Sequence, residues 1–286
     1  DIAEGAKYPE RIVGVHYFYH AAKNKLVEVI PGPGTPESLI NDLVNFYAFH
    51  GKTPIIVKDA PGFAINRFFV PWLNEGARLL EEGFGSIKFI DEVARKVFGI
   101  GMGPFALMNA TGVPIAMHAA DGLASKLGDF YRPSQKLCDQ VASGNLWDEA
   151  ETIIYNNGSN NEDVVTSRLI AASLGVAAQM VSEGVIDATS NDLGTRAGLR
   201  WPVGPFELMN KIGVEKVGKM VGDLFSKWDM PLPAFAFNST DPVELEWVQA
   251  KAKGDTGFVI FSLHDRMNAL GELVVSQLDK AFTDFD

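Results

Sequence analysis

The first sixty residues alternate short apolar runs with polar breaks, in the pattern of an α/β structure. Three runs rich in β-branched and aromatic residues have the length and composition of strands: Ile12 to Phe18, Leu26 to Ile30 and Thr53 to Val57. Between the second and third runs, Thr35 is expected to cap a helix and Pro36 to open it. This order of strand, helix and strand predicts that the second and third strands pair in parallel.

The predicted helix carries Leu39, Leu43 and Phe46 on one face. A parallel sheet is normally buried on both faces by a larger doubly wound structure, so three strands make an incomplete sheet. The chain also has no starting Met. We therefore expect residues 1–59 to be a truncated, Rossmann-type remnant of a larger domain that lies upstream.

From Pro61 onward the pattern is helical, and the chain repeats itself at an offset of 101 residues. The motif Gly103-Pro104-Phe105 recurs as Gly204-Pro205-Phe206, with Leu-Met-Asn and a glycine following each copy. Residues 67–112 and 168–213 align without gaps with 14 identities in 46 positions, against roughly one in fifteen expected from ordinary composition. The chain therefore contains a duplicated helical unit.

Both copies carry an apolar helical stripe at corresponding positions: Phe69, Leu73, Ala77 and Leu80 in the first, and Ile170, Leu174, Ala178 and Val181 in the second. Each stripe needs a partner, so we expect the copies to form an intramolecular pseudo-dimer, as identical subunits do across a twofold axis. The Asn-rich stretch 156–163 is expected to connect them at the surface, and the Pro-bearing stretch 231–242 to form a second break.

The predicted fold class is mainly α: a truncated α/β remnant followed by two tandem helical repeat domains, at 60–155 and 164–250. Residues 255–286 do not continue the repeat. Phe258 to Leu263 has strand character, and Leu270 to Phe282 has the pattern of an amphipathic helix with Leu273, Leu278 and Ala281 apolar.

Composition excludes some functions. A net charge of -11 opposes general nucleic-acid binding, which needs clustered Lys and Arg. The single cysteine, Cys138, gives no internal disulfide and no metal cluster, and favours a reducing, cytoplasmic compartment. No apolar run approaches the roughly 18 residues of a membrane span, and Asp1 begins no recognisable signal peptide. We expect no metal and no nucleic-acid or membrane partner.

The candidate chemistry lies on the first two predicted strands. A histidine at the end of one strand and a carboxylate on its neighbour can form a dyad in which the carboxylate fixes the imidazole tautomer. His16 and Glu28, twelve residues apart, fit that arrangement. By spacing alone His20 is an equal candidate, and a structural histidine is the commoner alternative.

Five segments resemble the 3-hydroxyacyl-CoA dehydrogenase family in their order and spacing. They are VHYF at 15–18, LVEVI at 26–30, KDAPGFAINR at 58–67, Asn74-Glu75 and Glu82-Gly83. Each segment is short, but together they are specific, and the resemblance covers about residues 3–220. It selects His16 over His20.

The resemblance implies oxidation of a (3S)-hydroxyacyl-CoA to a 3-oxoacyl-CoA, as in fatty acid β-oxidation. His16 would take the proton from the 3-hydroxyl while hydride leaves C3 for NAD, Glu28 would hold His16, and Asn66 would hydrogen-bond the substrate near the reacting oxygen. The alternative for Asn66 is a helix N-cap. Its equivalent in the second copy is Ser167, so we expect one active site per chain and a structural second repeat.

The chain departs from the family pattern in two places. Many members carry Asn-Pro where this chain has Tyr19-His20, so we assign no cofactor contact there. Gly32-Pro33-Gly34 lacks the third glycine of a dinucleotide fingerprint and is expected to be a loop, and residues 99–103 a helix-ending turn. We therefore expect the NAD-binding domain to be largely absent and the chain to be inactive alone.

The tail, Thr256 to Leu263 with Met267 to Leu270, resembles the opening of a crotonase-type enoyl-CoA hydratase and implies a multifunctional fusion. The alternative is a C-terminal hairpin or arm of the helical region. Two other functions remain open for the chain: a related dehydrogenase of non-CoA hydroxy acids, and a non-catalytic helical dimerisation or assembly domain. The full-length protein could also be a homodimer.

Overall fold

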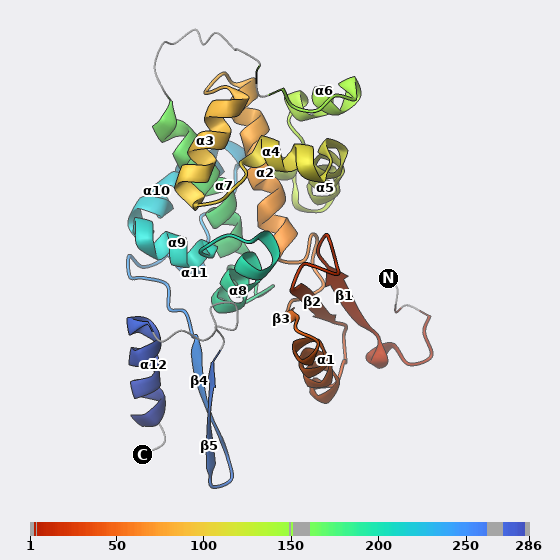
Figure 1. Cartoon of the computed structure of the whole chain (residues 1–286), viewed down its shortest axis with the longest axis vertical. Coiled ribbons are helices and arrows are strands. Elements are labelled where there is room, and N and C mark those ends of the chain that lie inside the picture. Colours follow the sequence, from red (N-terminus) through yellow and green to blue (C-terminus); the bar gives the residue numbers. More distant parts are fainter. Residues whose placement is uncertain (1–2, 4, 149, 151–160, 262–270, 284–286) are drawn as a thin grey trace.

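The computed structural model describes residues 3, 5–148, 150, 161–261 and 271–283. A helical body occupies the upper part of the view in Figure 1, and the small α/β segment, a β-hairpin and the last helix beside it all lie below this body. Most of the predicted connector at 156–163 falls outside the described residues.

The α/β segment is a three-stranded sheet with one helix in its crossover. A short 3₁₀ turn, η1 (Pro9–Arg11), precedes β1 (Val13–Tyr17), which pairs antiparallel with β2 (Leu26–Pro31). The helix α1 (Glu37–Phe49) leads from β2 to β3 (Thr53–Ile56), and β2 and β3 pair in parallel. The parallel pairing predicted from the strand-helix-strand pattern is confirmed.

The predicted cap of α1 is wrong by one position. Pro36, not Thr35, is the N-cap, because the Thr35 hydroxyl instead accepts the N–H of Gly32 at 3.0 Å. This bond closes the turn between β2 and α1. The segment Gly32-Pro33-Gly34 is thus a loop, as its sequence predicts.

The fold class predicted from the sequence is wrong in treating the α/β segment as a remnant. Leu26, Ile30, Ile55 and Val57 belong to the same hydrophobic core as the helical body. The face of the sheet that carries them lies so close to α8 (Ala188–Leu199) that a Cβ at Gly194 would be 2.7 Å from the Ile55 side chain. Because burial on this face is shared, sheet and helices form one packed structure.

The duplicated unit appears as two similar series of four helices. The first comprises α2 (Ile65–Glu81), α3 (Ile87–Phe98), α4 (Pro104–Thr111) and α5 (Val113–Leu127), and the second α7 (Glu162–Ser182), α8, α9 (Pro205–Ile212) and α10 (Val214–Phe225). After the first series come η2 (Asp129–Tyr131) and α6 (Gln135–Ser143), and after the second η3 (Ser226–Trp228) and α11 (Ala234–Phe237).

The repeated Gly-Pro-Phe motif has a shared physical cause. In each copy a buried aspartate, Asp91 or Asp192, accepts both free N–H groups at the start of the following helix, at 2.8 to 2.9 Å. The preceding residue must be glycine, because a Cβ at Gly103 or Gly204 would lie 2.4 Å or less from that aspartate. The turn therefore replaces an ordinary N-cap with a carboxylate from the previous helix.

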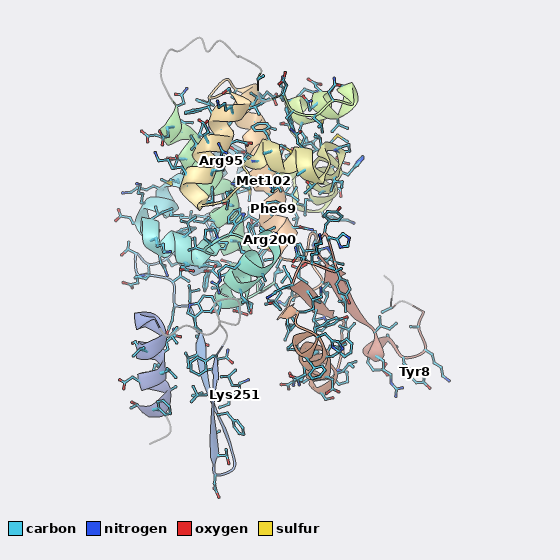
Figure 2. All side chains as sticks on the ribbon, in the orientation of Figure 1. Tyr8, Phe69, Arg95, Met102, Arg200 and Lys251 are labelled. Carbon is cyan, nitrogen blue, oxygen red and sulfur yellow. The ribbon has the colours of Figure 1, made fainter. Side chains whose placement is uncertain are left out.

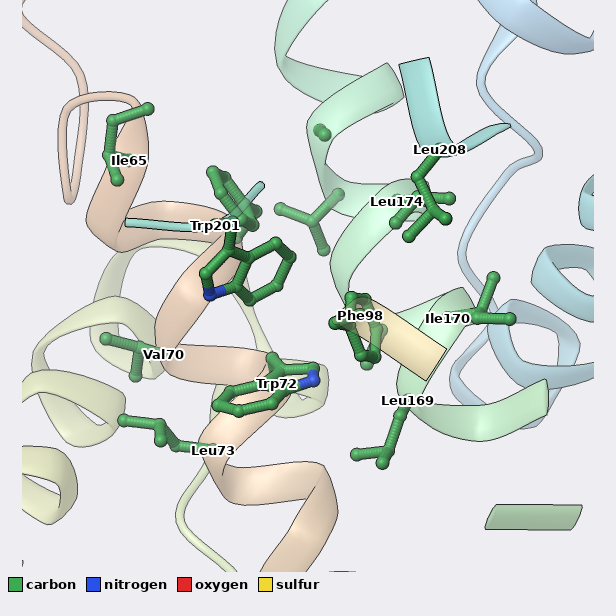
Figure 3. Close-up of a cluster of buried hydrophobic side chains, with 14 of the residues drawn as sticks. Ile65, Val70, Trp72, Leu73, Phe98, Leu169, Ile170, Leu174, Trp201 and Leu208 are labelled. Carbon is green, nitrogen blue, oxygen red and sulfur yellow. The ribbon is translucent and has the colours of Figure 1, made fainter. Parts of the chain in front are cut away.

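The helices α2 and α7 pack against each other in the middle of the body. Trp72 and Phe98 meet Trp201 from the second copy, with ring centroids 5.5 and 4.8 Å apart (Figure 3). Leu73 and Leu174 of the two predicted stripes are both buried. The core of the molecule thus lies between the copies.

The helix α7 also corrects an expectation about membrane spans. By length and composition, Glu162–Ser182 could cross a membrane, contrary to the expectation that no apolar run is long enough. However, 72% of its most apolar 18-residue stretch is buried inside the structure. Every residue from Leu169 to Ala178 is buried, because this part of α7 lies at the centre of the core.

The C-terminal part forms a hairpin, β4 (Val248–Lys253) and β5 (Thr256–Phe261), with α12 (Glu272–Thr283) packed on β4. The predicted strand and helix are both present, with shifted ends, and β4 was not predicted. The motif at 267–270 lies outside the described residues, so the crotonase resemblance stays a prediction.

Candidate active site

The strand pair β1 and β2 brings His16 and Glu28 together. They are direct partners in the antiparallel register, so their side chains leave the same face of the sheet. His16 Nδ1 lies 2.6 Å from Glu28 Oε2. The predicted dyad is therefore present as a short hydrogen bond, and His20, exposed in the loop after β1, takes no part in it.

Glu28 has a second role that the sequence did not reveal. Its other oxygen, Oε1, accepts the N–H of Ala64 at 3.1 Å and of Ile65 at 3.0 Å, where α2 begins. Ala64, the N-cap of α2, makes no side-chain cap bond, so Glu28 serves as the cap from another element. The positive end of the helix dipole favours negative charge at this position.

These contacts fix the roles of both carboxylate oxygens of Glu28, which is fully buried. With Oε2 as acceptor, Nδ1 of His16 carries a proton and the lone pair of Nε2 is available to a ligand. The His16 side chain is 28% exposed. Phe18 and Phe63 lie beside its ring at centroid distances of 4.7 and 5.3 Å, so aromatic side chains flank an imidazole that solvent partly reaches.

Asn66 lies in the first turn of α2, next to Ile65, and is half-buried. The alternative of an N-cap is wrong, because Ala64 occupies that position and Glu28 binds the free N–H groups. Its amide is therefore not needed for capping. The helix that Glu28 caps is thus the helix that carries Asn66.

The described residues fit the reacting end of a dinucleotide better than its phosphates. The partly exposed His16, with its aromatic neighbours, suits an alcohol beside a flat ring. The loop from Gly32 to Pro36 is a poor phosphate cradle, because two of its five residues are prolines without an N–H and the Thr35 hydroxyl is already bonded to Gly32.

The two parts of the chain meet at this site, where the buried carboxylate of a mixed α/β segment holds a histidine and caps the first helix of the helical body. The chain belongs to the 3-hydroxyacyl-CoA dehydrogenase family. The model of the family's C-terminal domain matches residues 62–156 and again 164–259, and that of its NAD binding domain matches residues 1–60.

The curated relatives agree with this family. The chain is 34% identical over 242 residues to the fatty acid oxidation complex subunit alpha of Idiomarina loihiensis, covering 76% of the chain and 34% of the relative. The protein of that name from Aliivibrio fischeri is 34% identical over 251 residues, covering 79% and 36%. The chain thus spans about a third of the length of these relatives.

Among solved structures, the 3-hydroxybutyryl-CoA dehydrogenase of Escherichia coli K12 superposes with a TM-score of 0.71 and 19% identity, covering 80% of this chain and 69% of the other. This likeness supports the fold. Together with the NAD-binding match over residues 1–60, it overturns the description of these residues as a remnant and the expectation that the NAD-binding domain is largely absent.

Proposed function

We propose that this chain carries the reaction centre of an NAD-dependent enzyme that oxidises a (3S)-hydroxyacyl-CoA to a 3-oxoacyl-CoA. The observation that carries the proposal is the bond between His16 and Glu28, with Glu28 anchored on the N-terminus of α2. This arrangement orients one imidazole nitrogen as a base and leaves it accessible. It supports a proton-abstracting role over a purely structural histidine.

In the forward direction, Nε2 of His16 accepts the proton of the substrate's 3-hydroxyl. NAD, when bound, supplies the nicotinamide that accepts hydride from C3. Glu28 keeps the proton on Nδ1 and stabilises the imidazolium that forms, while Asn66 hydrogen-bonds the substrate near the reacting oxygen. In the reverse direction the imidazolium is the acid, so the same pair serves both directions.

The proposed substrate class rests on the relatives, whose name refers to fatty acid oxidation. A related dehydrogenase of non-CoA hydroxy acids is the alternative. Assays with a 3-hydroxyacyl-CoA and with the corresponding free 3-hydroxy acid distinguish these two substrate classes. If the enzyme oxidises the free acid but not the CoA ester, the proposed substrate is wrong.

The role of His16 is tested by His16→Gln in the full-length protein. Loss of the base is expected to lower kcat by roughly 10²- to 10⁴-fold with KM largely kept. His20→Gln is the matched control, because His20 is exposed four residues further on, and it should keep near-normal turnover. Near-normal turnover of His16→Gln would refute the assignment.

We also propose that the two repeats act as an intramolecular pseudo-dimer. The support is the packing of α2 on α7 with buried residues of both stripes. In this arrangement the second repeat, with Ser167 in place of Asn66, supports the site of the first. A catalytically silent full-length protein of normal stability would instead favour the non-catalytic assembly domain.

A further inference from the structure

The loop that joins the two members of the dyad is tied to the second helical repeat by one buried side chain, Asn24. This residue is 8% exposed and lies two positions before β2 begins. Its Nδ2 donates to the carbonyl of Gly198 at 2.8 Å and more weakly to that of Tyr19 at 3.4 Å. Its Oδ1 accepts the N–H of Leu26 at 3.1 Å.

The backbone of Asn24 is engaged as well. Its N–H donates to the carbonyl of His20 at 2.9 Å, and its carbonyl accepts Nζ of Lys52 at 2.8 Å. Lys52 also binds the carbonyl of Ala21. Lys52 therefore holds the loop after β1 on one side, and Asn24 holds it on the other. Among the hydrogen bonds of the described residues, only the one from Asn24 joins this loop to Gly198.

The carbonyl of Gly198 is one of the last four of α8, which have no partner within the helix. Asn24 caps this carbonyl from 174 residues away in sequence. The contact is close: a Cβ at Gly198 would lie 2.4 Å from Cδ2 and 3.3 Å from Cβ of Leu26. Only glycine lets the start of β2 approach the helix this closely.

This contact leads directly to the dyad. Leu26 and Glu28 lie on the same face of β2, two residues apart, which is about 6.6 Å along a strand. The carboxylate of Glu28 in turn accepts hydrogen bonds from the start of α2. The strand that carries Glu28 is thus fixed at its start by the second repeat and at Glu28 itself by the first.

We propose that Asn24 is a positioning residue for the reaction and that the second repeat, through Gly198, sets where Glu28 holds His16. The inference rests on the proposed function. If the bond to Gly198 is lost, the hairpin shifts and the lone pair of Nε2 leaves its line to the substrate hydroxyl. Misplacement by about 1 Å costs up to about 10²-fold in rate.

The main test is Asn24→Asp in the full-length enzyme, assayed with a 3-hydroxyacyl-CoA and NAD. Aspartate has the same shape but cannot donate to Gly198, and its charge faces two carbonyl oxygens. We expect kcat to fall at least about tenfold with KM for both substrates within about threefold. In a single turnover, the rate constant of hydride transfer should fall as well, because a misplaced base slows the chemical step.

Asn210→Asp is the matched control. Like Asn24, Asn210 donates to a backbone carbonyl and accepts a backbone N–H, both of Val243 and each at 2.8 Å, but it lies on α9. If the two variants lose equal activity, or if Asn24→Asp leaves kcat within twofold, the proposal is overturned. A loss of kcat with an unchanged single-turnover rate constant also overturns it, because that result reports a smaller active fraction.

A second variant, Gly198→Ala, disturbs the same contact from the α8 side and introduces no buried charge. It should lower kcat at least about fivefold while the helix gains propensity. Gly122→Ala in α5 is its control, since a Cβ there meets no atom within 4 Å. If His16→Gln is inactive but both Asn24→Asp and Gly198→Ala are normal, this inference fails and the proposed function stands.

Discussion

Arg67 and Glu183 form an ion pair between the two repeats, with Nη2 of the arginine 2.7 Å from Oε2 of the glutamate. The equivalent residues at the offset of 101 form the reciprocal pair: Arg168 Nη1 lies 2.5 Å from Glu82 Oε2. Such reciprocity is the property of a contact across a twofold axis. The two pairs thus support the proposed pseudo-dimer with polar contacts as well as apolar packing.

The two arginines should differ in their contribution to stability. Arg168 also bonds Glu75 at 2.5 Å, and Glu75 is fully buried, whereas Glu183 is 40% exposed. Arg168→Met leaves a buried carboxylate with one partner, Arg78, and should lower the free energy of unfolding by about 3 kcal/mol or more. Arg67→Met should cost less, because Glu183 is rehydrated. Urea unfolding measures both.

Adding Glu75→Gln to Arg168→Met should bring no recovery, because it leaves the buried Arg78 without its carboxylate partner. Equal losses for the two arginine variants, or a recovery of stability in the double variant, would contradict this account of the interface.

Glu28→Gln tests how the dyad is oriented. The amide oxygen can still accept the N–H groups of Ala64 and Ile65, so the amide nitrogen faces Nδ1 of His16 and donates to it. The proton of His16 then moves to Nε2, which can no longer act as a base. We expect kcat to fall by roughly 10²- to 10⁴-fold, as in catalytic triads that lose their carboxylate. Glu28→Asp, which keeps an acceptor, should lose less; a Gln variant with normal kcat would rule out the proposed tautomer.

Asp192 makes stability depend on pH. Burial raises its pKa to about 7, although the N–H groups of Phe206 and Glu207 and the charge of Arg196 oppose the shift. The unfolded pKa is about 3.9, so between pH 4 and 7 the folded chain holds the proton more tightly. The contribution of Asp192 to stability is therefore full below pH 4 and declines as pH rises to 7.

The decline amounts to at most about 1.4 kcal/mol per pH unit. Asp192→Asn removes the titrating group, so its unfolding free energy should decline less than that of the native chain between pH 5 and 7. Urea unfolding at pH 5, 6 and 7 measures the difference, and parallel curves for the two proteins would show that Asp192 does not titrate in this range.

Arg200 occupies a position where the first repeat has glycine. Gly99 ends α3 in the left-handed conformation with φ 66°, and Arg200, at the same place after α8, has φ 59°. Its side chain is exposed, and Figure 2 labels its place in the helical body. A left-handed residue with a Cβ costs roughly 1 to 2 kcal/mol, partly offset by the larger entropy of an unfolded glycine.

Arg200→Gly should therefore raise the free energy of unfolding by about 0.5 to 1 kcal/mol. Arg200→Ala is the control that keeps the Cβ and should change it little. Thermal or urea unfolding of the three proteins measures these differences in stability. A glycine variant less stable than the alanine variant would show that the left-handed backbone of Arg200 does not destabilise the native protein.

Much of the fold follows from local pattern. Apolar runs in the first sixty residues predicted three strands and one parallel pairing, and the offset of 101 predicted two matching series of helices. The signal for Asp91 and Asp192 was also present, since they are identical at this offset beside the Gly-Pro-Phe motif. Their role was missed because a carboxylate that caps another helix has no local signature.

What the sequence determined by itself was the set of elements, the duplication and the residue types of the dyad, because side-chain periodicity and repeated motifs are properties of neighbouring residues. Only the tertiary structure decided that Glu28 also caps α2, that Asn24 binds Gly198, and that the sheet shares one core with the helices. These contacts join residues 36 to 174 positions apart, and their energy arises only when packing brings the chain segments together.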